Sequence, residues 1–208
     1  MMKLFVKLFG PYPPLADGYT VVVTDDDLEI PPLEAQGDLD LRRQPLRREA
    51  QFGTADRARA GPPVVRELRH RAALAPHLAA RSFACYAEWL WSEHCGGEES
   101  ADELARHYHQ RLIDSPQDLV LADPGPPRDM FDDRVYKRGA LTLHALRKEI
   151  GDSDFFALLK DWADRYRHSS VVTDDFTGLA AQYAHNSLRP LWAAWLYSPK
   201  VPPLDSLS

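Results

Sequence analysis

The spacing of apolar residues predicts helices over most of the second half of the chain. From Phe83, apolar residues recur at steps of three and four through Tyr86 and Leu90, and Cys95-Gly-Gly97 then supplies residues that end a helix. The same pattern predicts further helices from Ser100 to about Leu112, over Arg134–Ile150, over Phe155–Tyr166, after Thr173 and over Leu188–Tyr197. Beyond Phe83 we therefore expect a helical lobe.

The start of the chain carries a different pattern. Met1–Phe9 has helical spacing, and Gly10–Pro14 ends it because adjacent prolines cannot continue a helix. Tyr19–Thr24 is short and β-branched, as is typical of a strand. Together these patterns predict an α+β fold that is predominantly α.

Composition separates Asp38–Ser82 from the rest of the chain. This stretch has ten arginines, no lysine and five acidic residues, whereas the whole chain has a net charge of −6. Its four prolines interrupt any long helix, so we expect little stable structure there. A nucleic-acid patch is disfavoured, because Phe52 is the one aromatic residue in the stretch and the protein is acidic.

The same stretch offers few metal ligands. Glu67-Leu-Arg-His70 and His77 form the nearest approach to a metal site. Two histidines are not enough, because a zinc site needs at least three protein ligands. The histidines at 94 and 144 are interpreted as helix-surface or core residues and not as ligands.

Length and hydropathy narrow the class of protein. The 208 residues suffice for one sizeable domain, and no apolar run reaches the eighteen residues that a membrane span requires. The first residues lack the cleavage site of a secretory signal, and Cys85 and Cys95 make a poor disulfide pair. We expect a protein of the cytoplasm, without membrane or nucleic-acid partners.

Several segments, in their order and spacing, resemble the aminopeptidase N family of zinc metallopeptidases, gluzincins with a thermolysin-like catalytic domain. They are Leu33–Gly37, Phe83-Ala-Cys-Tyr86, Val135-Tyr-Lys-Arg-Gly-Ala140, and Trp195–Lys200. The resemblance implies a partial thermolysin-like catalytic domain, with a small β portion followed by a helical lobe. It divides the chain into a remnant of the β portion at 1–37, an aberrant arginine-rich segment at 38–82, and the helical lobe at 83–208.

The resemblance also implies roles for two residues. The family's tyrosine in the segment that corresponds to Val135–Ala140 stabilises the oxyanion, which assigns that role to Tyr136. Glu34 takes the place of the glutamate that grips the free α-amine of a peptide substrate. In the intact family, two histidines of HExxH and a later glutamate bind zinc, and the glutamate of HExxH is the general base.

This sequence departs from the family where the zinc ligands belong, since the written chain has no HExxH. Reading each codon one base late permits HELAHQWF over Ala58–Val65 and a glutamate at Arg81. The second shifted histidine falls at Pro62, which leaves the family's eighteen positions before that glutamate. The hypothesis is two compensating single-base shifts, near Gly37 and near Ser82; the alternative is chance compatibility in a GC-rich gene.

The expected function is therefore that of a fragment of a zinc-dependent aminopeptidase, which removes N-terminal residues from peptides. As written, the chain is expected to bind no zinc and to be inactive. The alternative is a non-catalytic remnant or interaction scaffold.

Overall fold

The structure is a computed structural model that describes residues 2–11, 20–24, 34–35, 38–42, 74–123, 132–166, 169 and 171–204; for the strands and residues 74–80 it describes the backbone alone. Helices dominate these residues, as expected. They are α1 Met2–Phe9, α4 Leu74–His94, α5 Ala101–Ile113, α6 Asp133–Ile150, α7 Asp152–Arg165, α8 Thr173–Ala180 and α9 Arg189–Trp195. None of the helices in the described ranges is long and apolar enough to cross a membrane.

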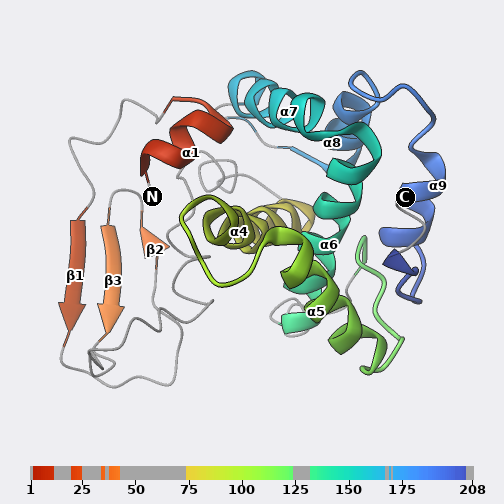
Figure 1. Ribbon diagram of the computed structural model, residues 1–208, viewed down its shortest axis with the longest axis horizontal. Helices are drawn as coiled ribbons and strands as arrows, with labels where there is room; N and C mark the ends of the chain where they lie inside the picture. Colours follow the sequence, from red (N-terminus) through yellow and green to blue (C-terminus); the bar gives the residue numbers. More distant parts are fainter. Residues whose placement is uncertain are drawn as a thin grey trace.

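A small three-stranded sheet lies to one side of the helices (Figure 1). Its strands are β1 Thr20–Thr24, β2 Glu34–Ala35 and β3 Asp38–Arg42, in the order β1-β3-β2. β3 pairs with β1 in parallel and with β2 antiparallel. The strand expected at Tyr19–Thr24 is thus confirmed as β1.

The expectation of little stable structure over Asp38–Ser82 is wrong at both ends of that stretch. β3 occupies Asp38–Arg42, where aspartates alternate with leucines at the period of a strand. α4 begins at Leu74 and not near Phe83. The alanines before Phe83 favour a helix, and Pro76 lies in its first turn, where proline is tolerated. The residues between, 43–73, lie outside the described part.

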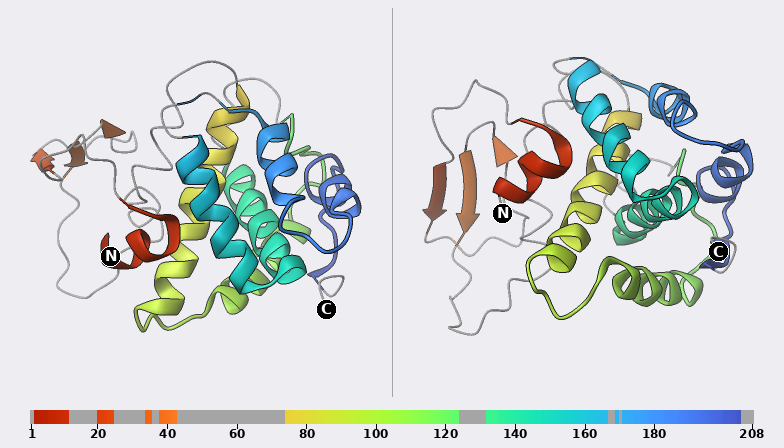
Figure 2. Two further views of the ribbon diagram at one scale, coloured as in Figure 1. Left: turned by 90° about the horizontal axis from the view of Figure 1, so that it is seen from above. Right: turned by 45° about the horizontal axis from the view of Figure 1, so that its top comes forward.

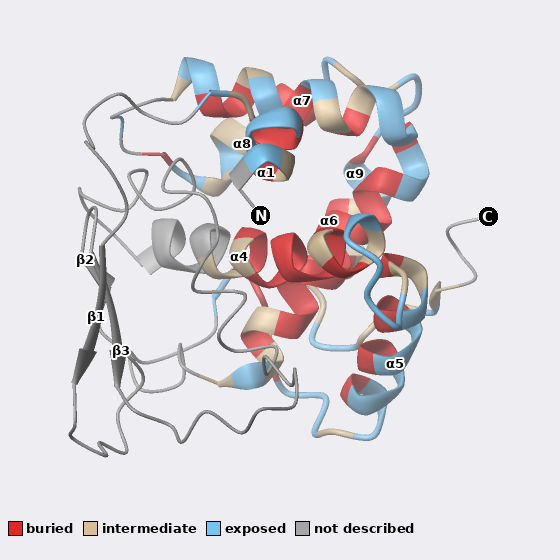
Figure 3. Ribbon diagram, turned by 60° about the vertical axis from the view of Figure 1, so that its left-hand side comes forward, coloured by how far each residue is buried: buried red, intermediate tan, exposed pale blue. Residues whose placement is uncertain are grey.

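α4 and α6 form the centre of the helical lobe, and most of their described length is buried (Figure 3). α5 packs against both, and α7 packs against α6. α1 lies on the other side of α4 from α6 (Figure 2), where the ring centroids of Phe5 and Trp91 are 6.2 Å apart. These contacts join the helices into one continuous core around the α4–α6 pair.

The two central helices approach most closely where Gly139 of α6 faces Ser82 of α4. A Cβ atom added to Gly139 would lie 1.8 Å from the Ser82 Oγ atom and 3.2 Å from the Ser82 Cα atom. No side chain fits into such a gap. The glycine of the Val135–Ala140 segment is therefore required by packing between helices.

The ends of the helices follow the expected capping signals, with one correction. Ser100 caps α5 and exchanges hydrogen bonds with Glu103, and Gly151 ends α6 with a φ of 82°. A helix was expected after Thr173, but Thr173 is itself the first residue of α8. Val172 precedes it, and its backbone N–H donates to the Asp175 carboxylate at 2.8 Å. The carboxylate, and not the threonine hydroxyl, satisfies the free donor.

Arg138 fastens the C-terminal segment to the core of the lobe. Its side chain is 1% exposed, and its guanidinium donates to backbone carbonyls from two parts of the chain. The acceptors are the carbonyl oxygens of Leu119, Ala194, Trp195, Ser198, Pro199 and Lys200. Burial lowers the pKa of Arg138 to about 10. This value is still well above neutral pH, and the guanidinium therefore keeps its charge.

Candidate functional site

Tyr136 lies in the first turn of α6, and the residues around it hold that turn in place. Asp132 caps the helix, and its carboxylate accepts from the Arg134 backbone N–H at 2.9 Å. The Arg134 guanidinium binds both Asp132 and Asp118, with 2.7 Å between N and O in each pair. Hydrogen bonds from Arg134 hold the pKa of Asp132 below its ordinary value. These contacts anchor the helical turn that carries Tyr136.

Arg81 of α4 meets the Tyr136 side chain. Its Nη1 atom donates to the Tyr136 hydroxyl, and its Cζ atom lies 4.8 Å from the centroid of the Tyr136 ring. This geometry combines a hydrogen bond to the oxygen with a cation–π contact to the ring. Residue 81 and Tyr136 are 55 positions apart in the sequence, and the packing of α4 on α6 brings them together.

The close contact between the two helices fixes this pair. Arg81 precedes Ser82, while Tyr136 lies three residues before Gly139 and so on the same side of α6. The contact between Ser82 and Gly139 sets the distance between the two helices beside this pair. It thereby helps to bring residue 81 next to Tyr136.

The described residues do not fit a metal ion. Among them, no three histidine, cysteine, aspartate or glutamate side chains gather where they could hold one. Arg81, the residue beside Tyr136, is a cation and has no lone pair for a metal. Glu34 lies in β2, opposite Leu39 of β3, and its side chain is outside the described atoms.

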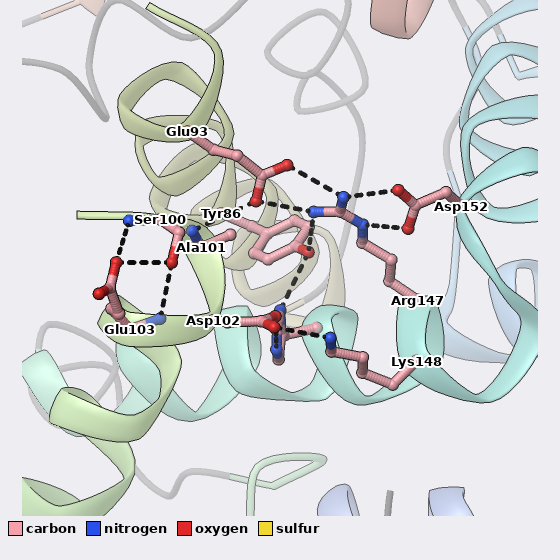
Figure 4. Close-up of polar contacts among 10 residues, drawn as sticks. Tyr86, Glu93, Ser100, Ala101, Asp102, Glu103, Arg147, Lys148 and Asp152 are labelled. Atoms are coloured by element: carbon pink, nitrogen blue, oxygen red, sulfur yellow. Dashed lines mark hydrogen bonds and ion pairs between the residues drawn. The ribbon is translucent and has the colours of Figure 1, made fainter. Parts of the chain in front are cut away.

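A second polar cluster surrounds His144 of α6, which contacts α4 and α5. Figure 4 shows its members Tyr86, Asp102 and Lys148. The His144 Nδ1 atom lies 3.2 Å from the Tyr86 hydroxyl, and Nε2 lies 3.2 Å from Asp102 Oδ1. Burial lowers the pKa of His144 to about 4, so the ring is neutral at pH 7. His94, in contrast, is exposed, and its Nδ1 atom lies 2.9 Å from the Leu90 carbonyl oxygen. Both positions agree with the interpretation of these histidines as core and surface residues.

Arg147 extends this cluster to a third helix. Its guanidinium binds Glu93 of α4 at 3.0 Å and Asp152 of α7 at 2.8 Å, and Figure 4 shows these carboxylates on either side of it. It also donates to the Tyr86 hydroxyl at 3.5 Å. Sequence reasoning missed this cluster. The available signal was the spacing of His144, Arg147 and Lys148, which places three polar residues on one face of an otherwise apolar helix.

Comparison with known proteins decides the family. A model described as the Peptidase family M1 domain matches residues 80–195, more than half of the chain. The chain belongs to peptidase family M1. This result confirms the family that the sequence motifs indicated, and both Arg81 and Tyr136 fall within the matched residues.

Solved M1 structures share the fold. A mutant M1 zinc metallopeptidase from Deinococcus radiodurans, bound to a Tyr-Ser-Ala substrate, is 25% identical with a TM-score of 0.79. The same organism's M1 zinc metallopeptidase in another crystal structure is 25% identical with a TM-score of 0.74. Each comparison covers 98% of this chain and 44% of the other. The M1 helical lobe is thus the architecture of the chain.

A curated relative matches a shorter part. The leucyl aminopeptidase of Saccharolobus solfataricus is 23% identical over 87 residues, which is 42% of this chain and 11% of that protein. The chain therefore spans less than half the length of each of these M1 relatives.

Proposed function

We propose that this M1 chain is a fragment of a zinc-dependent aminopeptidase that acts on the N-terminal residues of peptides, and that it is inactive as written. The observation that carries the proposal is the contact between position 81 and the Tyr136 hydroxyl. In the shifted reading frame, position 81 permits the glutamate that is the third zinc ligand of the family. Tyr136 is the residue that the family resemblance assigns to the oxyanion.

The chemistry of the contact supports both halves of the proposal. In a zinc aminopeptidase, the tyrosine hydroxyl and the metal act on the same carbonyl oxygen, so the third ligand must stand near the tyrosine. Residue 81 has that position relative to Tyr136. An arginine there is a fixed positive charge, which repels a divalent cation. In its present sequence, the chain thus keeps the helices around the proposed site but lacks the family's zinc ligands.

Inactivity follows from the missing groups. Peptide hydrolysis of this type needs a metal to activate water and a carboxylate to move the proton. Tyr136 and Glu34 can hold an oxyanion and a substrate amine, but neither generates a nucleophile. The intact protein, on this proposal, binds zinc and acts on peptides in the cytoplasm. Glu34 binds the substrate amine.

The first experiment uses the purified chain. Its zinc content is measured by atomic emission after dialysis, and hydrolysis of an aminoacyl p-nitroanilide is followed with and without added zinc. We expect less than one equivalent of zinc and no turnover above the buffer rate. One tightly bound equivalent together with zinc-dependent turnover would overturn the proposed inactivity.

The frameshift hypothesis is tested separately, in DNA. Resequencing the gene from independent isolates should reveal the two compensating shifts near Gly37 and Ser82. If every isolate has the written reading frame, the arginine-rich stretch is a genuine feature of the protein.

The alternative function is a non-catalytic scaffold, and the completeness of the helical core favours it. Trp89, Leu90 and Phe155 are fully buried, although the stretch before α4 lacks the zinc-site sequence. The lobe therefore keeps its packing without the catalytic residues. The zinc content of a chain with the two shifts reversed separates the two candidates: one tightly bound equivalent supports the aminopeptidase fragment, and its absence supports the scaffold.

A further inference from the structure

The first turn of α5 is attached to the lobe through the cluster around His144. The Ala101 backbone N–H donates to Glu93 Oε2 at 3.2 Å. Asp102 uses both carboxylate oxygens, with Oδ1 at 3.2 Å from His144 Nε2 and Oδ2 at 2.8 Å from Lys148 Nζ. Figure 4 shows Ala101 and Asp102 turned toward these partners. Ser92 separately holds the preceding loop, since its hydroxyl donates to the Glu99 carbonyl oxygen at 2.6 Å and its carbonyl oxygen accepts from the Gly97 N–H at 2.9 Å. The polar contacts of the first turn itself depend on the charge state of the cluster.

The geometry around His144 fits a neutral ring. With Nε2–H donating to Asp102, Nδ1 is left to accept the Tyr86 hydroxyl proton. The Tyr86 oxygen in turn accepts from Arg147 Nη1 at 3.5 Å. Tyr86 and His144 are 1% and 3% exposed, so water does not replace these partners. Every polar atom of the pair is satisfied in this one arrangement.

A proton on Nδ1 disrupts the arrangement. Nδ1 would then donate to the Tyr86 oxygen, and the Tyr86 hydroxyl proton would lose its acceptor in a buried place. The new charge would also stand near Arg147 and Lys148, two cations of the same helix. Asp102 offsets this charge in part, but it is 43% exposed and already paired with Lys148.

The other charged groups of the cluster are already engaged. Glu93 and Asp152 bind Arg147, and His94 lies 3.8 Å from Glu93. The titratable and charged groups that face His144 or its partners come from four helices: Tyr86, Glu93 and His94 from α4, Asp102 and Arg106 from α5, Arg147 and Lys148 from α6, and Asp152 from α7.

We propose that protonation of His144 releases the first turn of α5, with the preceding Cys95–Ser100 loop, while the rest of α5 stays docked. The later part of the helix has its own attachments. Trp89 stacks on Tyr108 with ring centroids 5.5 Å apart and an interplanar angle of 2°. His109 Nε2 lies 2.7 Å from the Pro202 carbonyl oxygen. The release is a local, acid-driven opening at the surface of the lobe, and it is independent of the proposed function.

Hydrogen exchange read by mass spectrometry tests this inference on the full chain. Exchange is measured at pH 7 and pH 5 and corrected for the intrinsic rate at each pH. Between these values the carboxylate of Asp102 stays ionised, because its ion pair with Lys148 outweighs burial and lowers its pKa. The released ring takes up a proton at its ordinary pKa of about 6.5, whereas the docked ring does so only near a pKa of 4, so opening becomes easier as the pH falls from 7 to 5. We expect protection over 95–104 to fall about tenfold, with protection over 105–113 unchanged.

Two variants identify the group responsible. His144→Gln replaces the ring with an amide, which can donate and accept hydrogen bonds but does not titrate. The loss of protection at 95–104 between pH 7 and pH 5 should then disappear. His94→Gln is the matched control and should keep the effect. The inference is overturned if the native chain shows no change at 95–104, if His144→Gln keeps the change, or if the whole lobe loses protection together.

A second measurement covers the case in which His144→Gln does not fold. The His144 ring is titrated by NMR in the native chain, and protection at 95–104 is followed over the same pH range. A ring midpoint well below 6.5, with protection that begins to fall near pH 6.5, supports the inference. A ring that titrates at its ordinary value, or protection that does not change as the pH falls below that value, overturns it.

Discussion

Arg138 illustrates how much one buried side chain can hold together. An ordinary buried arginine is matched by a carboxylate, yet the described contacts of this guanidinium are backbone carbonyls on two segments. Two of these carbonyls, those of Ala194 and Trp195, lie in the last turn of α9, where a helix leaves its oxygens without an N–H partner. Arg138 therefore acts as a cap for α9, which packs against α6.

We expect Arg138→Met to lower the free energy of unfolding by about 3 kcal/mol or more, because buried carbonyl oxygens lose their donors. Urea denaturation followed by tryptophan fluorescence measures the change. Arg165→Met is the matched control, since Arg165 makes an exposed pair with Asp161 one turn away. Its midpoint should stay at the native value. Equal midpoints for the two variants would show that the carbonyls find other partners.

At the scale of elements, the α4–α6 crossing depends on the absence of a side chain at residue 139. Gly139→Ala places a Cβ atom 1.8 Å from the Ser82 Oγ atom, and the helices must separate. We expect a loss of about 1–3 kcal/mol in the free energy of unfolding, the usual cost of overpacking. Chemical denaturation of the variant gives the value.

Gly178 provides the control for this substitution. It lies inside α8, and a Cβ atom added there has no neighbour within 4 Å. Gly178→Ala should be neutral or slightly stabilising, since alanine is the better helix former. In Gly139→Ala with Ser82→Gly, the nearest obstructing atoms are gone, and part of the lost stability should return. A double variant as unstable as Gly139→Ala alone would contradict the packing argument.

The sequence predicted most elements but few of the contacts between them. Caps and apolar spacing are local signals, so the helix that starts after Ser100 and the one that Gly151 ends could be located from sequence. β3 was not predicted, because the alternation of aspartate and leucine over Asp38–Arg42 is only five residues long and begins the arginine-rich stretch. Arg138 and its acceptors after α9 are about 60 positions apart, and no local pattern records such a pairing.

The candidate site rests on local signals as well. The motif predicts Tyr136 as a site residue, and the spacing of the shifted ligands predicts position 81; the roles of both remain predictions. The direct contact between them follows from the packing of α4 on α6, which single residues do not encode. Glu34 remains a prediction, because its side chain lies outside the described atoms.

For the whole molecule, a protein with the two shifts reversed and the remaining segments of a full-length M1 relative supplied should hydrolyse aminoacyl p-nitroanilides. In that protein, Tyr136→Phe should lower kcat about 10²–10³-fold and change KM much less. In the proposed oxyanion role, the hydroxyl of Tyr136 forms its hydrogen bond chiefly in the transition state. Steady-state kinetics gives both constants. A change in KM alone would assign Tyr136 to ground-state binding.

The contact between Ser82 and Gly139 has a consequence for engineering. Because α4 packs directly on α6 there, a change of Arg81 is made next to the Tyr136 hydroxyl without altering the glycine contact between the helices. An acidic, neutral or thiol side chain at position 81 would therefore change the charge beside Tyr136 while Ser82 and Gly139 stay as they are.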